Sequence, residues 1–201
     1  MKKLILLIVL LLGASRLTTE NQIQPNTETV REIIESCLTD EKLISRYEET
    51  IKKYSVQYGV DELFLGRRGR TESRFDPFAE GDKNSNGVPV SFGSFQIKTN
   101  YFNHLLFYVD HGQLGKYLKE REAKGLPIDY SRYYKRIGYN TEMACIIFSN
   151  YLHKYDGCYV KTASAYGFGS AHPSHKAVMK NPDIVWDTNI KYYGFIRDSL
   201  R

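Results

Sequence analysis

The chain has 201 residues, 42% of them hydrophobic, and a formal net charge of +5 at pH 7. That length and composition fit one domain with an ordinary hydrophobic core. The positive charge is mild and no Lys- or Arg-rich tract accompanies it, which argues against nucleic acid as a partner. A small basic bias of this kind suits a protein that works on an anionic polymer.

The first fifteen residues have the pattern of a secretory signal. Lys2 and Lys3 precede an unbroken apolar run over residues 4–12, and small residues follow at 13–15. The run is shorter than the about 20 residues that span a membrane, so an uncleaved anchor is the lesser alternative. We therefore predict a signal over 1–15 and an exported chain that resides in the periplasm or cell envelope.

Three helices are predicted in the first half of the mature chain. An apolar stripe with helical spacing covers residues 30–38, and a second covers 43–54 with Gly59 as its natural stop. Asp61 is a candidate N-cap for a third helix over 62–73. We assign the polar arm and first helix to residues 16–44, ahead of the main domain at 45–201.

The segment after the third helix has a different character. Residues 77–89 lack apolar periodicity and are rich in Gly, Asn and Asp, so they are predicted to be a loop with at most a short β-like patch. Helical patterns then return over residues 101–109, 113–123, 142–155, 160–166 and 184–200. The fold class predicted is mainly α, with a cleft walled in part by residues 76–97 and little or no β-structure.

Four short blocks, in this order, carry a resemblance to a known family. They are Tyr58-Gly59-Val60-Asp61 leading into Glu72-Ser73-Arg74-Phe75-Asp76-Pro77, Gly93-Ser94-Phe95-Gln96-Ile97, Tyr151-Leu152, and Ala165-Tyr166-Gly167-Phe168-Gly169. Together they resemble the soluble lytic transglycosylase (SLT) domain. The resemblance implies a lysozyme-like fold and an enzyme that cleaves the β-1,4 bond between N-acetylmuramic acid and N-acetylglucosamine in peptidoglycan. It also implies a 1,6-anhydro product end and no metal or organic cofactor.

The resemblance assigns a role to five residues. Glu72 is the expected catalytic residue, acting as general acid and then as general base. Ser73, Phe95, Gln96 and Tyr166 are expected to bind substrate, with the Tyr166 hydroxyl close to the catalytic carboxylate. Each also has a plain structural interpretation, as a helix-end serine, a core aromatic or a glutamine that holds a loop.

Two features depart from the family pattern. Residues 66–70 read Gly-Arg-Arg-Gly-Arg, where the family has an apolar helix, and each helical glycine costs up to about 1 kcal/mol. Gly167 stands where the family has Asn. We expect the arginines to find acidic partners or line the cleft, or the segment to be irregular. The departures motivate one alternative, a non-catalytic wall-binding component associated with secretion or appendage machinery.

Asp82 motivates a second alternative. Glycoside hydrolases generally use two carboxylates, and Asp82 could activate water beside Glu72, which would make the protein a muramidase. Asp82 also opens a stretch, 82–87, that copies half of a calcium loop. The twelfth position is Gly93 where a bidentate glutamate is needed, so we expect turn chemistry and no metal, with a weak calcium site as the alternative.

The cysteines leave the disulfide question open. Cys37, Cys145 and Cys158 are odd in number, and Cys145 with Cys158 is the nearest pair in sequence. No Cys or His cluster has zinc-ligand spacing. We expect a monomer whose partner is the glycan strand of peptidoglycan.

Overall fold

The computed structural model describes residues 28–98, 119–126 and 135–181. The predicted signal and the helices predicted over 101–109 and 184–200 lie outside these residues. Of the helix predicted over 113–123, only residues 119–123 are described, and they are helical. Within the described ranges, no helix combines the length and the apolar character needed to cross a membrane.

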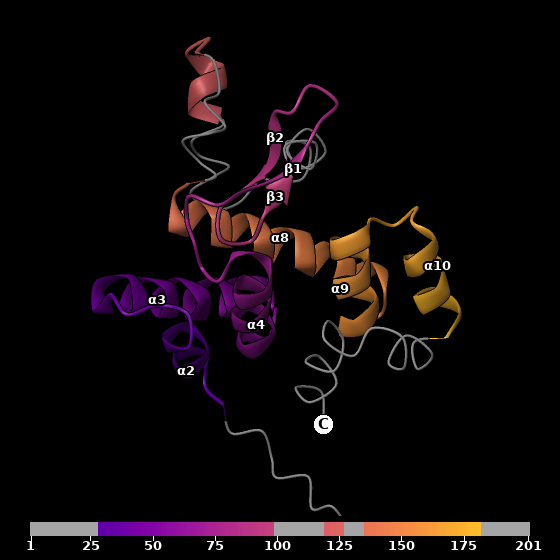
Figure 1. The fold of residues 1–201 in the computed structure, drawn as a ribbon, viewed down its shortest axis with the longest axis horizontal. Coiled ribbons are helices and arrows are strands. Elements are labelled where there is room, and N and C mark those ends of the chain that lie inside the picture. The colour runs from indigo at the N-terminus through magenta and orange to yellow at the C-terminus, as the bar shows by residue number, and fades with distance from the viewer. Residues whose placement is uncertain (1–27, 99–118, 127–134, 182–201) are drawn as a thin grey trace, which may run out of the picture.

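The described chain is mainly helical with one small sheet, which confirms the predicted fold class (Figure 1). The elements in chain order are α2 (Val30–Glu35), α3 (Glu41–Tyr58), α4 (Glu62–Ser73), β1 (Glu80–Lys83), β2 (Pro89–Phe92), β3 (Ile97–Lys98), α8 (Ile137–Lys154), α9 (Tyr159–Phe168) and α10 (Pro173–Lys180). Helices α3 and α8 pack against each other, as do α9 and α10.

Cap residues fix the bounds of the first three helices. Thr29 and Glu32 form a reciprocal capping box that starts α2. The Asp40 carboxylate accepts from backbone N–H groups at the start of α3, and Asp61 does the same for α4. Gly59 ends α3 in the left-handed conformation, with φ of 65°. Gly59 and Asp61 therefore act as the sequence predicts.

Part of the sheet lies in the segment that is predicted to be a loop, because β1 falls within residues 77–89 and β2 begins at Pro89, whereas β3 lies beyond it. β1 and β2 form an antiparallel hairpin that pairs Glu80 with Phe92 and Lys83 with Pro89, and β2 pairs with β3 through Phe92 and Ile97. β1 is almost entirely exposed, so its sequence carries no apolar alternation for a periodicity argument to detect. The prediction of a loop over 77–89 was therefore only partly right.

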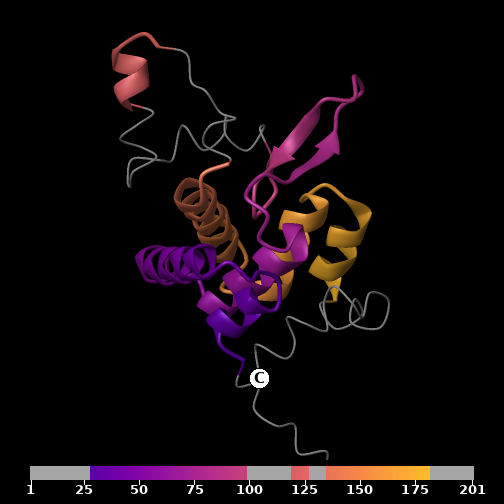
Figure 2. The same cartoon turned by 60° about the vertical axis from the view of Figure 1, so that its left-hand side comes forward.

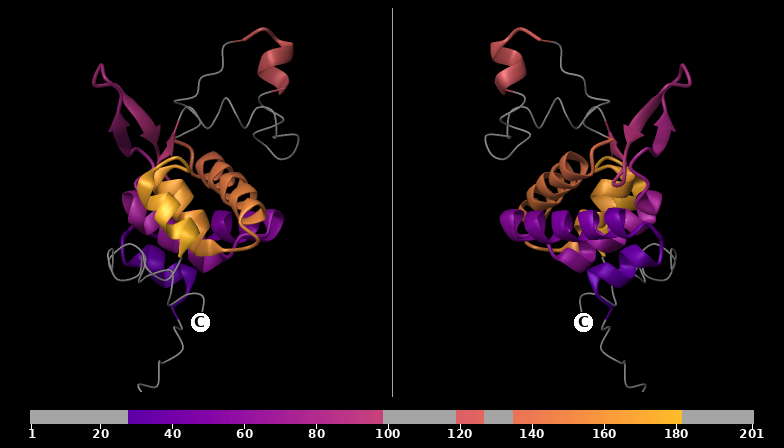
Figure 3. Two further views of the ribbon diagram at one scale, coloured as in Figure 1. Left: turned by 90° about the vertical axis from the view of Figure 1, so that its right-hand side faces the viewer. Right: turned by 90° about the vertical axis from the view of Figure 1, so that its left-hand side faces the viewer.

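The hairpin stands out from the helical body. β1 and β2 project away from the helices in the turned views (Figure 2 and Figure 3), whereas β3 contacts α8. At the hairpin tip, Asn84 Oδ1 accepts hydrogen bonds from the N–H groups of Asn86 and Val88. The half calcium loop thus forms a turn, as expected.

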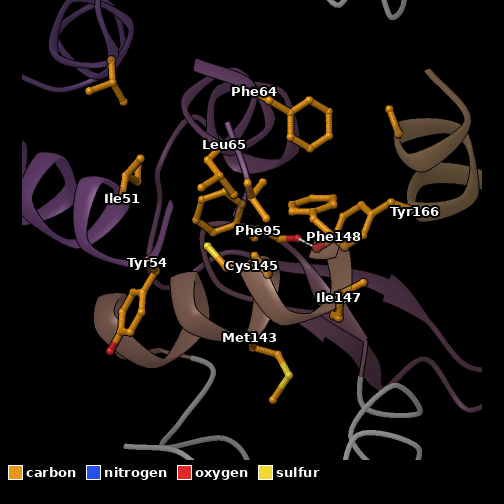
Figure 4. Packing of buried hydrophobic residues seen from close by; sticks show 14 of the residues in the cluster. Ile51, Tyr54, Phe64, Leu65, Phe95, Met143, Cys145, Ile147, Phe148 and Tyr166 are labelled. Carbon is orange, nitrogen blue, oxygen red and sulfur yellow. Dashed lines mark hydrogen bonds between the residues drawn. The ribbon is translucent and has the colours of Figure 1, made fainter. Parts of the chain in front are cut away.

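The core lies among α3, α4, α8 and α9 (Figure 4). Phe64 of α4, Phe148 of α8 and Tyr166 of α9 form an aromatic chain, with ring centroids 5.0 Å apart for the first pair and 4.5 Å for the second. Such pairs contribute about 0.5–1.5 kcal/mol each beyond their buried area. This row of three rings ends at Tyr166, which also lines a pocket between α4, the sheet and α9.

The three cysteines are free thiols. Cys145 is fully buried in α8, and this burial raises the pKa of its thiol well above the ordinary value. It therefore behaves as a core residue. The pairing of Cys145 with Cys158, left open by the sequence, is not made.

Candidate functional site

A polar pocket of about 280 Å³ lies between the end of α4, the sheet and α9. Its lining residues are Glu72, Gly81, Asp82, Ser91, Gln96, Lys98, Tyr166 and Gly167. Four of the residues singled out from the sequence, Glu72, Asp82, Gln96 and Tyr166, therefore meet at one place. They come from four different elements or turns of the chain, so the fold and not sequence proximity brings them together.

Glu72 lies in the last turn of α4 with its side chain 17% exposed. Its carboxylate accepts a hydrogen bond from the guanidinium of Arg68, one helical turn earlier, and the Arg68 side chain is only 1% exposed. The same guanidinium lies over the ring of Tyr166, 5.3 Å from its centroid. An acid, a buried cation and an aromatic face thus form one cluster at the pocket.

The arginines of the unusual α4 segment all have acidic partners. Arg67 is buried and pairs with Glu28, and Arg70 pairs with the other oxygen of the same carboxylate at 2.9 Å. Arg68 takes Glu72. The expectation that the arginines find acidic partners is confirmed, and α4 is a regular helix throughout residues 62–73.

The two glycines of this segment are explained by close packing. A Cβ at Gly66 would lie 3.0 Å from Val30 of α2, and a Cβ at Gly69 would lie 2.4 Å from the ring of Phe75. Gly69 therefore lets Phe75, which is fully buried, fold back under the helix. Glycine lowers the helix propensity of α4, and the close packing of Phe75 compensates for that cost.

Ser73 and Gln96 hold the turn that follows β2. The Ser73 hydroxyl donates to the Ser94 carbonyl at 2.9 Å. Gln96 donates from Nε2 to the Gly93 carbonyl at 3.0 Å and accepts at Oε1 from the Ser91 hydroxyl at 3.0 Å. A primary amide has two donors and two acceptor lone pairs, so these bonds use half of the capacity of Gln96. Its amide remains at the pocket wall, whereas Ser73 does not line the pocket.

Phe95 belongs to the core and not to the pocket. Its ring is fully buried, which corrects the expectation that it contacts substrate. Its backbone is what connects it to the site, because the N–H donates to Asn140 Oδ1 at 2.8 Å and the carbonyl accepts from the Tyr166 hydroxyl (Figure 4). The Tyr166 hydroxyl is thus anchored to Phe95, and it is the Tyr166 ring that faces the Arg68 and Glu72 pair.

Asp82 supplies a second carboxylate to the pocket. It forms an ion pair with Lys98 at 2.8 Å, and the two side chains are 57% and 39% exposed. Exposed pairs of this kind contribute about 0–1 kcal/mol, so a ligand could separate them at little cost. Within the described residues, no group of acidic, His or Cys side chains is arranged to hold a metal ion.

The sequence analysis did not single out Arg68 as the partner of Glu72 or Lys98 as a residue of the pocket. Arg68 carried a usable signal, because it precedes Glu72 by the i, i+4 spacing at which helical ion pairs form. Lys98 carried none, since its approach to Asp82 depends on the order of strands in the sheet.

The site suits proton transfer to a polar ligand. A carboxylate with little exposure lies at one side, and amide, hydroxyl and charged groups line the rest, which are groups that bind the hydroxyl and acetamido substituents of sugars. Comparisons of the chain with protein-family models, with curated proteins and with solved structures found no match.

Proposed function

We propose that the chain is an exported peptidoglycan lytic transglycosylase of the periplasm or cell envelope. It cleaves the bond between N-acetylmuramic acid and N-acetylglucosamine and leaves a 1,6-anhydro end. The observation that carries this proposal is the convergence of Glu72, Gln96 and Tyr166 on one pocket. These residues come from three separate blocks of the sequence resemblance, and the fold places them together.

Glu72 acts alone as the acid and base. In its protonated form it donates a proton to the glycosidic oxygen while the bond from that oxygen to the anomeric carbon breaks. The 6-hydroxyl oxygen of the N-acetylmuramic acid residue then attacks the anomeric carbon of that same residue. The ionised carboxylate accepts the proton that this 6-hydroxyl loses. Glu72 regains its proton, no water is consumed, and the reaction needs no cofactor.

The other pocket residues bind and orient the glycan. Gln96 has a donor and an acceptor beyond those committed to Ser91 and Gly93. Gly167, where the family has Asn, presents only backbone at the wall beside Tyr166. The glycan thus meets a polar surface in which the Glu72 carboxylate is the proton donor.

A muramidase is the second candidate, and the position of Asp82 favours it. Asp82 and Glu72 line the same pocket, and a hydrolase would use such a second carboxylate to activate water. The Asp82 carboxylate forms an ion pair with Lys98 at the same wall of the pocket. The two reactions differ in their products by one molecule of water.

Mass spectrometry of the soluble products from purified walls separates these candidates. Anhydro-muropeptides support the transglycosylase, and muropeptides with reducing ends support the muramidase. Co-sedimentation with walls in the absence of any product would instead support the non-catalytic wall-binding component. Glu72→Gln serves as the inactive control, and activity retained in that variant would contradict both enzymatic candidates.

A further inference from the structure

Arg68 is a buried cation whose position in the fold has no explanation in packing alone. Its side chain is 1% exposed, so its charge has been removed from water almost completely. Burial of a guanidinium is strongly unfavourable unless an acid compensates it. The Glu72 carboxylate provides that compensation from the next turn of the same helix.

The surroundings of the pair restrain both partners. The Tyr166 ring of α9 lies beside the guanidinium, 5.3 Å from centroid to Cζ. The Tyr166 hydroxyl donates in turn to the Phe95 carbonyl in the turn before β3, and the labelled rings of Phe95, Phe148 and Tyr166 lie together beside this bond (Figure 4). Arg68 is therefore held between α4 and α9, and its guanidinium fixes where the carboxylate points.

We propose that Arg68 is a positioning residue for the reaction, a role that rests on the proposed function of Glu72. When Glu72 gives its proton to the glycosidic oxygen, the carboxylate becomes negative, and the adjacent guanidinium stabilises that charge without having to move. Arg68 thus makes Glu72 a stronger acid. It also keeps the carboxylate aimed at the pocket while the 6-hydroxyl returns the proton.

The same pair limits the pH range of the enzyme. Among the residues that the structure describes, the charged and titratable groups that contact Glu72 or line the pocket with it are Arg68 from α4, Asp82 from β1, Lys98 from β3 and Tyr166 from α9. Arg68 is the one in direct contact through an ion pair, and it favours the deprotonated carboxylate. Activity requires the protonated acid, so Arg68 places the alkaline limit of activity at lower pH than Glu72 would have without it.

The test is the pH dependence of wall cleavage in Arg68→Met, with two comparison variants. Arg68→Met keeps an unbranched side chain in the core but removes the charge. We expect its maximal rate to fall about tenfold or more, and the alkaline limb of its profile to move upward by about 1–3 pH units. Arg68→Lys keeps a cation there and should leave the limb near its wild-type position.

Arg67→Met is the matched control for a purely structural effect. The Arg67 side chain is also buried, with 2% of its surface exposed, but its partner is Glu28, which does not line the pocket. This variant should lose stability, as judged by thermal melting, while its alkaline limb stays in place. An Arg68→Met protein that is folded and keeps the wild-type limb would overturn the proposal.

A direct measurement separates this proposal from the proposed function. Carbon-13 NMR of the Glu72 carboxyl, assigned through Glu72→Gln, follows its protonation without any substrate. At a given acidic pH, Arg68→Met should shift that signal toward the protonated form, and no shift would overturn the role of Arg68. If wild-type protein releases no product from walls, the proposed function fails whatever this signal does.

Discussion

Gly81 of β1 lies directly against the amide of Gln96, so that a Cβ at position 81 would lie 2.0 Å from Gln96 Oε1. The contact explains why glycine stands in an otherwise ordinary strand. A methyl group added at position 81 would therefore displace the Gln96 side chain at the pocket wall.

Gly81→Ala should weaken substrate binding more than it weakens the fold. The methyl group displaces the Gln96 side chain, which loses its bonds to Ser91 and Gly93 at a cost of about 0.5–1.5 kcal/mol each. We expect KM for soluble glycan fragments to rise with a smaller change in kcat. Gly138→Ala is the control, because a Cβ there meets open space. An unchanged KM in Gly81→Ala would show that Gln96 does not contact the substrate.

Glu72→Gln should destabilise the protein as well as inactivate it. The change leaves the Arg68 guanidinium buried without a countercharge, for which we expect a loss of about 3 kcal/mol in the free energy of unfolding. The double variant Arg68→Met with Glu72→Gln should recover much of that loss while staying inactive. Urea denaturation of the three proteins checks this, and equal stability of both variants would contradict the dominance of the buried charge.

Gly69→Ala should destabilise α4 although alanine is the better helix former. The gain in helix propensity is about 1 kcal/mol. Against it, the new Cβ would lie 2.4 Å from the Phe75 ring, and overpacking of this kind typically costs about 1–3 kcal/mol. We expect a net loss in the free energy of unfolding. Combining Gly69→Ala with Phe75→Leu should relieve part of it, and a more stable single variant would contradict the packing described for Phe75.

His175 should make stability depend on pH. It is buried between Tyr155 of the α8 C-terminus and Ser164 of α9, and burial lowers its pKa from the ordinary value of 6.5. As pH falls below 6.5 the unfolded chain takes up a proton before the folded chain does. Stability is therefore full above this pH and declines below it, toward the lowered folded pKa. Denaturation across this range should show less decline in His175→Gln.

The helices could be predicted from the sequence where local signals decide them. Asp40, Gly59 and Asp61 act at α3 and α4 as their chemistry indicates. The start of α8 was missed by several residues, because Ile137 begins the helix without a side-chain cap. Asn140, in its first turn, bridges the Phe92 carbonyl and the Phe95 N–H. That is a tertiary contact, which no local pattern contains.

The α10 helix was also missed, although it carried a signal. Pro173 stands at its first position and the His172 side chain accepts from the Ser174 N–H, which is the arrangement expected at a helix start. Its apolar stripe is short and its buried residues are only His175 and Val178. A helix this short gave too few turns for periodicity to be recognised.

The residues of the candidate site could likewise be predicted only in part from the sequence. Glu72, Gln96 and Tyr166 were found from short blocks of sequence, and the fold brings them to one pocket. Phe95 was assigned from the same block as Gln96, but its ring is buried in the core. Side-chain direction in an irregular turn, where Gln96 has a φ of 49°, follows from the backbone and not from the residue type.

The proposed cleavage of the glycan by Glu72 without consumption of water can be checked from the reaction products. Purified walls digested with the protein are analysed by mass spectrometry, with the double variant Arg68→Met and Glu72→Gln as the folded control. We expect 1,6-anhydro-muropeptides from the wild-type protein and none from the control. Products with reducing ends, or the same products from both proteins, would contradict it.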